Sequence, residues 1–550
     1  MWTHRTPTRG TVTGSTAESR TAGPQRCASP AVSGVLAALV TGSLIIVPAA
    51  HAAPFAVPGQ DECEPGAEAP EKRQMRAAWI ASVANIDWPS KRGLPPRDQQ
   101  EELTRLYDEA ASYGLNAVFV QIRPTADAFW PSPHEPWSKW LTGEQGRNPG
   151  YDPLEFAVEE AHERNLEFHG WFNPYRIATH DDPGRLVEGH PARENPEWVL
   201  EYGDRLYYNP GIPAARSFVQ DAMMHAVENY DMDGVHFDDY FYPYPVAGEA
   251  LPDQGTYARY GDDFTNIADW RRNNVDLLVQ EMNQRINDTR PHVKFGVSPF
   301  GIWRNAGSDP AGSATNGLES YDRLYANTRK WARQGWLDYI NPQVYWEIGH
   351  DAADYAALVP WWADVVEGTG VQLYIGQAAY KVGEQPGAWQ DPGELSRHLT
   401  FNRDHPQVDG DVYFSATSLR TNAAQARRTL VEEHYAHPAL VPVKEDLGGE
   451  APPAPEITSA ARTGDRAELT IEAAAGSEPA YYAVYRFDSA SDPDAHACGL
   501  DPRAMVATVR ASEDRTRFTA PDAPPAQNYY VTALDRLHHE SGASAPRYVP

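Results

Sequence analysis

The sequence is poor in cysteine and in positive charge. Three cysteines occur among 550 residues, and none belongs to a Cys/His cluster with the spacing of a zinc site. The 47 basic residues are outnumbered by 76 acidic ones, so the formal net charge is −29. A charge of that sign argues against a nucleic-acid partner or a polyanion held by bulk charge.

Signatures of several common enzyme classes are also missing. The sequence contains no Gly-x-Ser-x-Gly elbow and no phosphate-binding loop, and no Ser-His-Asp arrangement is expected at the strand ends. Together with the lack of a zinc motif, this leads us to expect neither a metal ion nor another cofactor.

The first 52 residues have the pattern of an export signal. Several arginines precede an apolar run from Ala31 to Val47, and Ala50-His51-Ala52 is a small-x-small cleavage site. A membrane anchor is the alternative, but the run is short for a span and contains Ser, Thr and Gly. We expect a signal peptide over residues 1–52, no membrane span after its removal, and a secreted or cell-wall-associated protein.

Residues 53–74 are rich in Pro, Glu and Gly and are expected to form a flexible leader. Cys63 and Cys498 remain after cleavage of the signal and fall in different predicted domains. Whether they pair is left open.

A β/α alternation occupies residues 75–436. Strand patterns, each followed by a helical pattern, are expected at residues 75–83, 116–121, 167–172, 233–240, 294–300, 338–346, 371–377 and 410–415. Eight such units in one run predict an α/β fold, a (β/α)8 TIM barrel. A doubly wound open sheet is the alternative, which the lack of a glycine-rich loop after the first strand disfavours.

The pattern changes after the barrel. Residues 437–455 are rich in Pro, Gly and Glu and are expected to be a linker. Residues 456–550 contain short strand patterns at residues 467–471, 481–487, 505–509, 517–519 and 529–534. They predict a small all-β sandwich similar to a fibronectin type III module, for which a scaffold role is the more probable interpretation.

Two adjacent carboxyl groups end the fourth predicted strand. Val235 and Phe237 alternate with His236 and Asp238, and Asp239 follows directly. An Asp at such a place is often only the cap of a turn. Here the strand end belongs to the barrel face on which active sites form, so both groups are candidates for catalysis.

Amide, charged and aromatic side chains are gathered at the other strand ends. Any single ring is more often packing than a ligand contact, but their accumulation at one barrel face suggests a sugar site. The candidate substrate-binding residues are Asp87, Trp88, Arg123, Trp130, Trp171, Asn173, Tyr175, Arg176, Tyr240, Trp303, Gln343, Tyr345, Trp346 and Tyr380. The two arginines either bind an acidic group of the sugar or brace the carboxylates.

Glycoside hydrolysis requires two carboxyl groups that flank the scissile bond. Asp238 or Asp239 supplies one, and Glu384 or Glu347 is the candidate for the other. Glu384 is preferred, because it follows the seventh strand, which lies opposite the fourth in a ring of eight.

A series of motifs resembles the glycosyl-hydrolase-like 10 family of bacterial barrel proteins. In order along residues 75–436 they are Met75-Arg-Ala-Ala-Trp-Ile-Ala-Ser-Val with Asp87-Trp-Pro89, Val120-Gln-Ile-Arg-Pro-Thr-Ala-Asp127, Pro149-Gly-Tyr-Asp-Pro153, His169-Gly-Trp-Phe-Asn-Pro-Tyr-Arg176, Asp233-Gly-Val-His-Phe-Asp-Asp-Tyr-Phe-Tyr242, Gly296-Val-Ser-Pro-Phe-Gly-Ile-Trp-Arg-Asn305 and Asn341-Pro-Gln-Val-Tyr-Trp346.

The resemblance implies a (β/α)8 fold and a glycosidase. For an enterobacterial relative it implies cleavage of denuded peptidoglycan glycan strands, which have lost their stem peptides, with a Glu after strand seven as the catalytic group. Glu384, in Lys-Val-Gly-Glu, matches that motif. The additional C-terminal sandwich leaves open whether the target is the cell's own wall or an external polysaccharide.

The hypothesis that follows is a secreted glycoside hydrolase whose partner is a polysaccharide, with peptidoglycan glycan strands preferred. The alternative is a non-catalytic carbohydrate-binding protein of the cell wall. A metal-dependent hydrolase such as a deacetylase, suggested by His236, Asp238 and Asp239, is weaker, because strand alternation places Asp239 on the opposite side from the other two. The sequence does not determine the linkage cleaved, its stereochemistry or the oligomeric state.

Overall fold

The computed structural model describes residues 70–488, 500–512, 515–521 and 523–550. The expected signal peptide, all but the end of the expected leader, and both Cys63 and Cys498 lie outside these residues. Within them, no helix combines the length and the apolar character needed to cross a bilayer.

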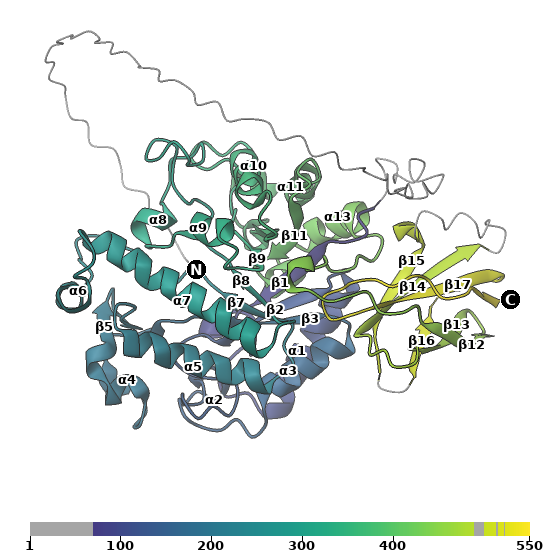
Figure 1. Cartoon of the computed structure of the whole chain (residues 1–550), viewed down its shortest axis with the longest axis horizontal. Coiled ribbons are helices and arrows are strands. Elements are labelled where there is room, and N and C mark those ends of the chain that lie inside the picture. The colour runs from purple at the N-terminus through teal and green to yellow at the C-terminus, as the bar shows by residue number, and fades with distance from the viewer. Residues whose placement is uncertain (1–69, 489–499, 513–514, 522) are drawn as a thin grey trace, which may run out of the picture. The chain divides into compact units, whose positions relative to one another are not determined.

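Eight parallel strands close into a barrel, in the order β1-β11-β10-β9-β8-β7-β3-β2 (Figure 1). Because β1 pairs with both β2 and β11, the sheet has no free edge, which confirms the predicted barrel and excludes the open sheet. The strands are β1 (Met75–Ile80), β2 (Ala117–Arg123), β3 (Glu167–Phe172), β7 (Gly234–Phe237), β8 (Lys294–Val297), β9 (Tyr339–Ile340), β10 (Gln372–Gln377) and β11 (Val408–Tyr413).

Helices follow the strands and cover the outside of the barrel. The main ones are α1 (Pro96–Ser112), α3 (Pro153–Glu163), α5 (Pro213–Asn229), α7 (Ile267–Thr289), α9 (Thr328–Arg333), α10 (Tyr355–Val366), α11 (Glu394–Asn402) and α13 (Ala424–His434). The expected cap of α3 is present, because Asp152 Oδ1 accepts hydrogen bonds from the backbone N–H groups of Leu154 at 3.1 Å and Glu155 at 3.2 Å.

The strand period divides the apolar side chains between two cores. Inward side chains such as Trp79, Phe119, Tyr339 and Tyr374 fill the barrel, and outward ones pack against the helices. The rings of Phe119 and His169 stack at 4.4 Å between centroids, so the interior is filled by side chains and is not an open channel.

Insertions at the C-terminal ends of the strands build up one face of the barrel. Between β3 and α5 lies an antiparallel sheet of β4 (Arg176–Ala178), β6 (Arg205–Tyr208) and β5 (Val199–Tyr202). Short helices also lie in the insertions: α4 (Pro191–Glu194) between β4 and β5, and α2 (Lys139–Thr142), α6 (Gln254–Tyr260), α8 (Ser320–Arg323) and α12 (Ala416–Arg420) elsewhere. The backbone N–H of Val246, after β7, donates to the Tyr202 hydroxyl at 2.7 Å, so two of these insertions support each other.

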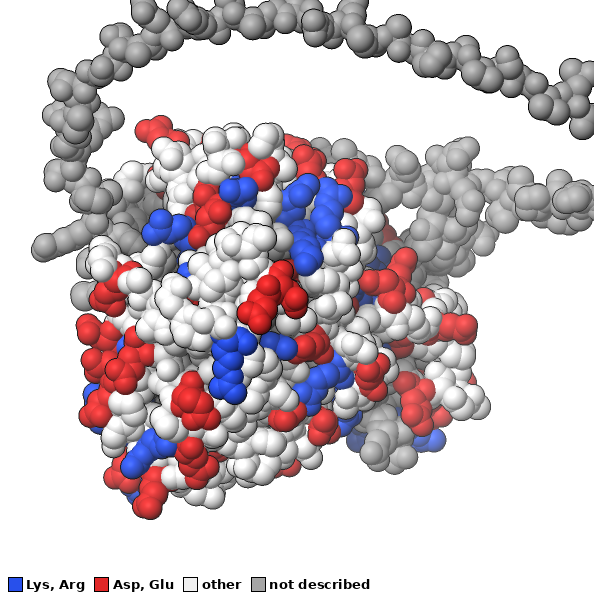
Figure 2. All heavy atoms as spheres, turned by 60° about the vertical axis from the view of Figure 1, so that its left-hand side comes forward, with Lys and Arg blue, Asp and Glu red and all other residues white. Residues whose placement is uncertain are grey.

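Charge is mixed on the face drawn in Figure 2. Asp and Glu side chains are interspersed there with Lys and Arg side chains, and no single sign of charge covers that face. This distribution does not have the form of a basic stripe that tracks a nucleic-acid backbone.

The C-terminal region is all-β, as predicted, and consists of two antiparallel sheets. One is β12 (Glu456–Thr463), β13 (Arg466–Glu472) and β16 (Thr516–Ala520), and the other is β15 (Met505–Arg510), β14 (Tyr481–Asp488), β17 (Gln527–Leu534) and β18 (Arg547–Val549). Ile471, Val484 and Val531 belong to the core between them. The fibronectin type III identity stays a prediction.

The segment expected to be a linker packs against the barrel. Leu440 and Val441 are buried, and the Lys444 ammonium, also buried, donates to the carbonyl of Gly370 at 2.9 Å. Gln372 at the start of β10 donates to the carbonyl of Val443 at 2.8 Å. Residues 440–444 therefore belong to the N-terminal face of the barrel, a role that composition alone did not indicate.

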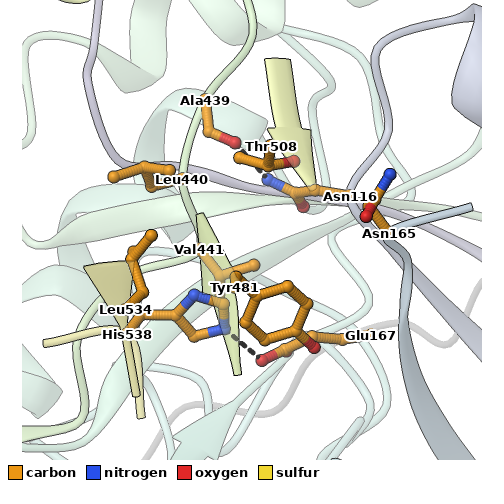
Figure 3. A pocket seen from close by; sticks show the side chains of 10 residues that line it. All are labelled: Asn116, Asn165, Glu167, Ala439, Leu440, Val441, Tyr481, Thr508, Leu534 and His538. Atoms are coloured by element: carbon orange, nitrogen blue, oxygen red, sulfur yellow. Dashed lines mark hydrogen bonds and ion pairs between the residues drawn. The ribbon is translucent and has the colours of Figure 1, made fainter. Parts of the chain in front are cut away.

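The C-terminal domain also reaches the N-terminal opening of the barrel. There the Glu167 carboxylate accepts a hydrogen bond from His538 of the C-terminal domain at 2.7 Å (Figure 3). It also accepts from the Lys294 ammonium at 2.8 Å and from His169 at 3.1 Å. Burial alone would raise the pKa of Glu167, but the Lys294 charge and the two histidines outweigh it and hold that pKa well below its ordinary value. The cavity beside Glu167 and His538 measures about 10 Å³, room for no more than one water molecule. This junction is a packed interface and not a binding pocket.

We expect His538→Ala to lower the stability of the protein. It removes a buried hydrogen bond to a charged group, which is worth about 1.5–3 kcal/mol. The urea midpoint of unfolding checks this, with Thr519→Ala, an exposed position of the same domain, as the control that changes little. Equal midpoints for the two variants would show that the contact contributes nothing.

Candidate active site

Asp238 lies at the C-terminal end of β7 and is held by three hydrogen bonds. Its Oδ1 accepts from the backbone N–H of Asp239 at 2.8 Å and from Gln343 Nε2 at 3.4 Å. Its Oδ2 accepts from Asn173 Nδ2 at 3.1 Å. Three donors around one carboxyl group fix its orientation.

Asp239 points to the other side of the strand and is buried, with 5% of its surface exposed. The Tyr244 hydroxyl donates a hydrogen bond to its Oδ2. Burial, followed by the neighbouring charge of Asp238, raises the pKa of Asp239 well above its ordinary value, and the bond from Tyr244 offsets part of that rise. Two adjacent carboxyl groups in such different surroundings are suited to different roles in acid–base chemistry.

A row of amide side chains positions Asp238. Gln121 Oε1 accepts from the backbone N–H groups of Ser82 and Val83 at 3.0 and 2.8 Å, and its Nε2 donates to Asn173 Oδ1 at 2.5 Å. Asn173 then donates to Asp238. The ends of β1, β2, β3 and β7 are thereby joined through side chains, which confirms that strand ends distant in sequence meet at one site.

Arg123 braces the site and is not available to a ligand. Its guanidinium and the Glu135 carboxylate form a fully buried ion pair at 2.5 Å, with both side chains 0% exposed. Arg123 also donates to the carbonyls of Asn173 and Pro174 at 2.6 and 2.9 Å. Of the two roles that the sequence left open for this arginine, the structure supports bracing.

Arg176 begins β4 beside Asn173 and forms no such ion pair with any residue that the structure describes. It donates through Nε to the carbonyl of Pro124 at 2.9 Å and through Nη2 to Asn173 Oδ1 at 3.2 Å. Its guanidinium lies 5.0 Å from the centre of the Tyr240 ring. Arg176 therefore touches the residue that orients Asp238.

Half-buried aromatic rings surround the carboxyl pair. One series of contacts runs from Tyr240 to Tyr244 (5.5 Å between centroids), Phe300 (6.5 Å) and Trp346 (5.7 Å). Another joins Tyr345 to Tyr380 at 5.8 Å and Tyr380 to Phe414 at 6.0 Å. Burial is the largest cause that raises the pKa of Tyr345, and the charges of Asp238 and Asp239 contribute. Rings that keep part of a face exposed can stack on sugars, so Tyr240, Tyr345, Trp346 and Tyr380 keep their candidate role.

Other predicted platforms lie inside the protein. Trp88, Trp130 and Tyr175 are 0% exposed, and Trp171 and Trp303 are almost as deeply buried. The indole N–H of Trp88 donates to the carbonyl of Gln99 at 2.7 Å, and that of Trp130 to His225 at 3.1 Å. A ring whose faces are covered by protein cannot stack on a sugar, so the three fully buried rings have packing roles in this structure. For Trp171 and Trp303 the sugar-binding role stays a prediction.

Asp87 joins the first and last strands. Its Oδ2 accepts from the backbone N–H of Ala81 at 2.8 Å, and its Oδ1 accepts from Ser415 Oγ at 2.6 Å and the N–H of Thr417 at 3.0 Å. Burial raises the pKa of Asp87. Its oxygens are occupied by the protein, and the structure does not bring them to a ligand.

The two glutamates expected to complete the carboxyl pair lie on loops. Glu384 is exposed between the short helices η5 (Ala379–Lys381) and η6 (Gly387–Gln390). Among the described residues its carboxylate has no hydrogen-bond partner. Glu347 accepts from the indole N–H of Trp389 at 2.8 Å, which ties two loops together. The Lys381 ammonium donates to the carbonyl of Tyr345 at 2.5 Å, so the loop of Glu384 is anchored beside the aromatic rings. No hydrogen bond joins either glutamate to Asp238 or Asp239.

His236 belongs to the barrel interior. Its Nε2 accepts from the indole N–H of Trp79 at 3.1 Å, and its Nδ1 lies 3.2 Å from the Tyr339 hydroxyl. Both ring nitrogens are therefore engaged by protein groups. In the described ranges, no three His, Cys, Asp or Glu side chains are grouped so that they could hold a metal ion.

Two residues that form hydrogen bonds or ion pairs within the site were not predicted from the sequence. Tyr244 stands in the aromatic cluster after Asp239, which was a signal that could have identified it. Glu135 lies in a Pro-rich loop, and no local pattern marks it as the partner of Arg123.

Residues 74–392 match the family described as glycosyl hydrolase-like 10. The chain belongs to this family. A family relative from Bacillus subtilis, glycosyl hydrolase YngK, is 49% identical over 488 residues, which cover 87% of this chain and 94% of the relative. Glycosyl hydrolase DigH from Escherichia coli K12 is 41% identical over 384 residues, 66% of this chain and 87% of the relative. These matches support glycoside hydrolase activity.

The match to the Bacillus relative extends into the C-terminal domain, because residues 1–455 alone make up less than 87% of 550 residues. Among solved structures, the glycoside hydrolase domain of PgaB (BpsB) from Bordetella bronchiseptica aligns with a TM-score of 0.41 and 13% identity over 64% of this chain and 98% of that chain.

We expect Glu135→Gln to destabilise the protein by about 3–5 kcal/mol, because it leaves the buried Arg123 charge without its counter-ion. Chemical denaturation of the purified variant measures the change. Glu144→Gln removes the same charge from an exposed ion pair at 3.8 Å and serves as the control. A loss of stability no larger than that of Glu144→Gln would mean that Arg123 finds another partner.

Proposed function

We propose that the protein is a secreted glycoside hydrolase that cleaves the glycan strands of peptidoglycan. The observation that carries the reaction type is the pair Asp238 and Asp239 at the strand end of a barrel, where burial and the neighbouring Asp238 raise the pKa of Asp239. The half-buried rings beside them supply the apolar surface that sugars need. The peptidoglycan substrate is supported by the family resemblance, and secretion by the pattern of residues 1–52.

Asp239 is the proposed general acid. A raised pKa favours the protonated form of a carboxyl group, which can give its proton to the glycosidic oxygen as the bond breaks. Asp238 is its proposed partner and would stabilise the positive charge that develops on the sugar ring. Glu384, which the resemblance implies as catalytic, would act from the loop after β10, on the far side of the substrate.

We expect Asp239→Asn to reduce kcat by about 10²–10⁴-fold, the usual contribution of a positioned general acid. Glu384→Gln is compared in parallel, with denuded glycan strands as substrate, intact peptidoglycan alongside, and mass spectrometry of the released sugars as readout. Full activity of Asp239→Asn would remove Asp239 from the mechanism, and full activity of Glu384→Gln would remove the role implied by the family. Binding of glycan without any product would support the non-catalytic alternative.

The Tyr244→Phe variant tests how the pKa of Asp239 is set. The tyrosine hydroxyl stabilises the ionised carboxylate, so its removal should raise the pKa of Asp239 further. If Asp239 acts in its protonated form, the alkaline limb of the pH profile of kcat/KM then moves to higher pH. A limb that stays in place or moves to lower pH would contradict the assignment.

A further inference from the structure

Arg176 is a buried cation that forms no ion pair with an acidic side chain in the described part of the chain. Only 6% of its surface is exposed, and no Asp or Glu oxygen of that part lies within 4.0 Å of its nitrogens. Arg123, the last residue of β2, has its own carboxylate partner in Glu135. A buried cation without an ion-pair partner is costly, so a site that keeps one is suited to an anion.

The guanidinium is positioned so that part of it remains available. Nε and Nη2 donate to Pro124 and Asn173, whereas Nη1 makes no hydrogen bond to any described residue. Tyr240 lies over the guanidinium at 5.0 Å and limits its movement. Such a fixed, planar donor suits a carboxylate, which it can bind with good directionality.

Arg176 is also close to the proposed reaction centre. Asn173 accepts from Arg176 at 3.2 Å through Oδ1 and donates to Asp238 at 3.1 Å through Nδ2. One amide side chain thus separates the cation from the carboxylate. A sugar held at Asp238 brings its own substituents to Arg176.

We propose that Arg176 binds a carboxylate carried by the sugar at the cleavage site, and that the enzyme selects acidic glycans through it. The inference rests on the proposed function and names the substrate group that this site recognises. In a peptidoglycan strand the group is the lactyl carboxylate of muramic acid, which is free only where the stem peptide has been removed. A stem peptide converts it to a neutral amide, which a guanidinium binds less strongly. A uronic acid presents the same chemistry.

The experiment compares glycans that differ in this one group. The substrates are denuded glycan strands, the same strands with the lactyl carboxyl converted to a methylamide, and hyaluronan as a source of uronic acid. The wild type, Arg176→Gln and Arg176→Lys are assayed for kcat/KM on each. Arg185→Gln is the control, since it removes one positive charge from an exposed position in the same β3–α5 insertion.

We expect the wild type to cleave the free-acid strands roughly 10- to 100-fold more efficiently than the methylamide, the usual worth of a charge-assisted hydrogen bond. Arg176→Gln should bring that ratio close to one, mainly through KM on the acidic strands, and Arg176→Lys should restore part of it. Arg185→Gln should keep the wild-type ratio. A purely structural role of Arg176 would reduce activity on both substrates by the same factor and leave the ratio unchanged, which would overturn the proposal.

The other outcomes separate the inference from the function on which it rests. Cleavage of both strand types by the wild type with equal efficiency would refute the carboxylate role and leave the glycosidase in place. Cleavage of hyaluronan alone, lost in Arg176→Gln, would replace the substrate and support the role. No cleavage of any glycan would refute both proposals. If Arg176→Gln does not fold, the wild-type preference for free acid over methylamide decides alone.

Discussion

The hydrogen-bonded row from Gln121 through Asn173 to Asp238 is the constraint on which the site depends. It exists because β2, β3 and β7 are consecutive neighbours in the barrel, and their inward side chains reach the same edge. Gln343 completes the row from β9, which is not adjacent to β7 or β3. Strand β7 lies between β3 and β9 in the strand order, so the two amides approach its carboxyl group from opposite sides.

The same strand geometry divides the two adjacent carboxyl groups. Successive residues of a strand point to opposite sides, so Asp238 turns toward the amides and Asp239 turns toward Tyr244 in a buried setting. Two covalent neighbours thereby lie in different surroundings, and the buried one, Asp239, has a raised pKa. The proposed division of labour between the two carboxyl groups depends on this geometry.

For the two arginines of the site and for the C-terminal domain, the structural role depends on which residues of other segments lie against them. Arg123 is structural because Glu135 lies against it, whereas Arg176 forms no ion pair with a described residue. At the opposite end of the barrel, His538 makes the C-terminal domain part of the support of β3 and β8, and residues 440–444 pack beside β10. That domain is better described as a brace for the barrel than as a module on a free linker.

The sequence by itself determined the barrel, the all-β C-terminal region, the family and the gathering of Asp238, Asn173 and Gln343, because strand and helix periods and strand-end positions are local properties of the chain. It did not determine which rings are exposed or which charges are paired. Trp88 and Trp130 sit beside strand ends like Tyr240 and Trp346, yet they are core residues. Exposure and ion pairing depend on what other segments, such as the loop of Glu135 or the C-terminal His538, place against a side chain. Only the tertiary structure could decide them.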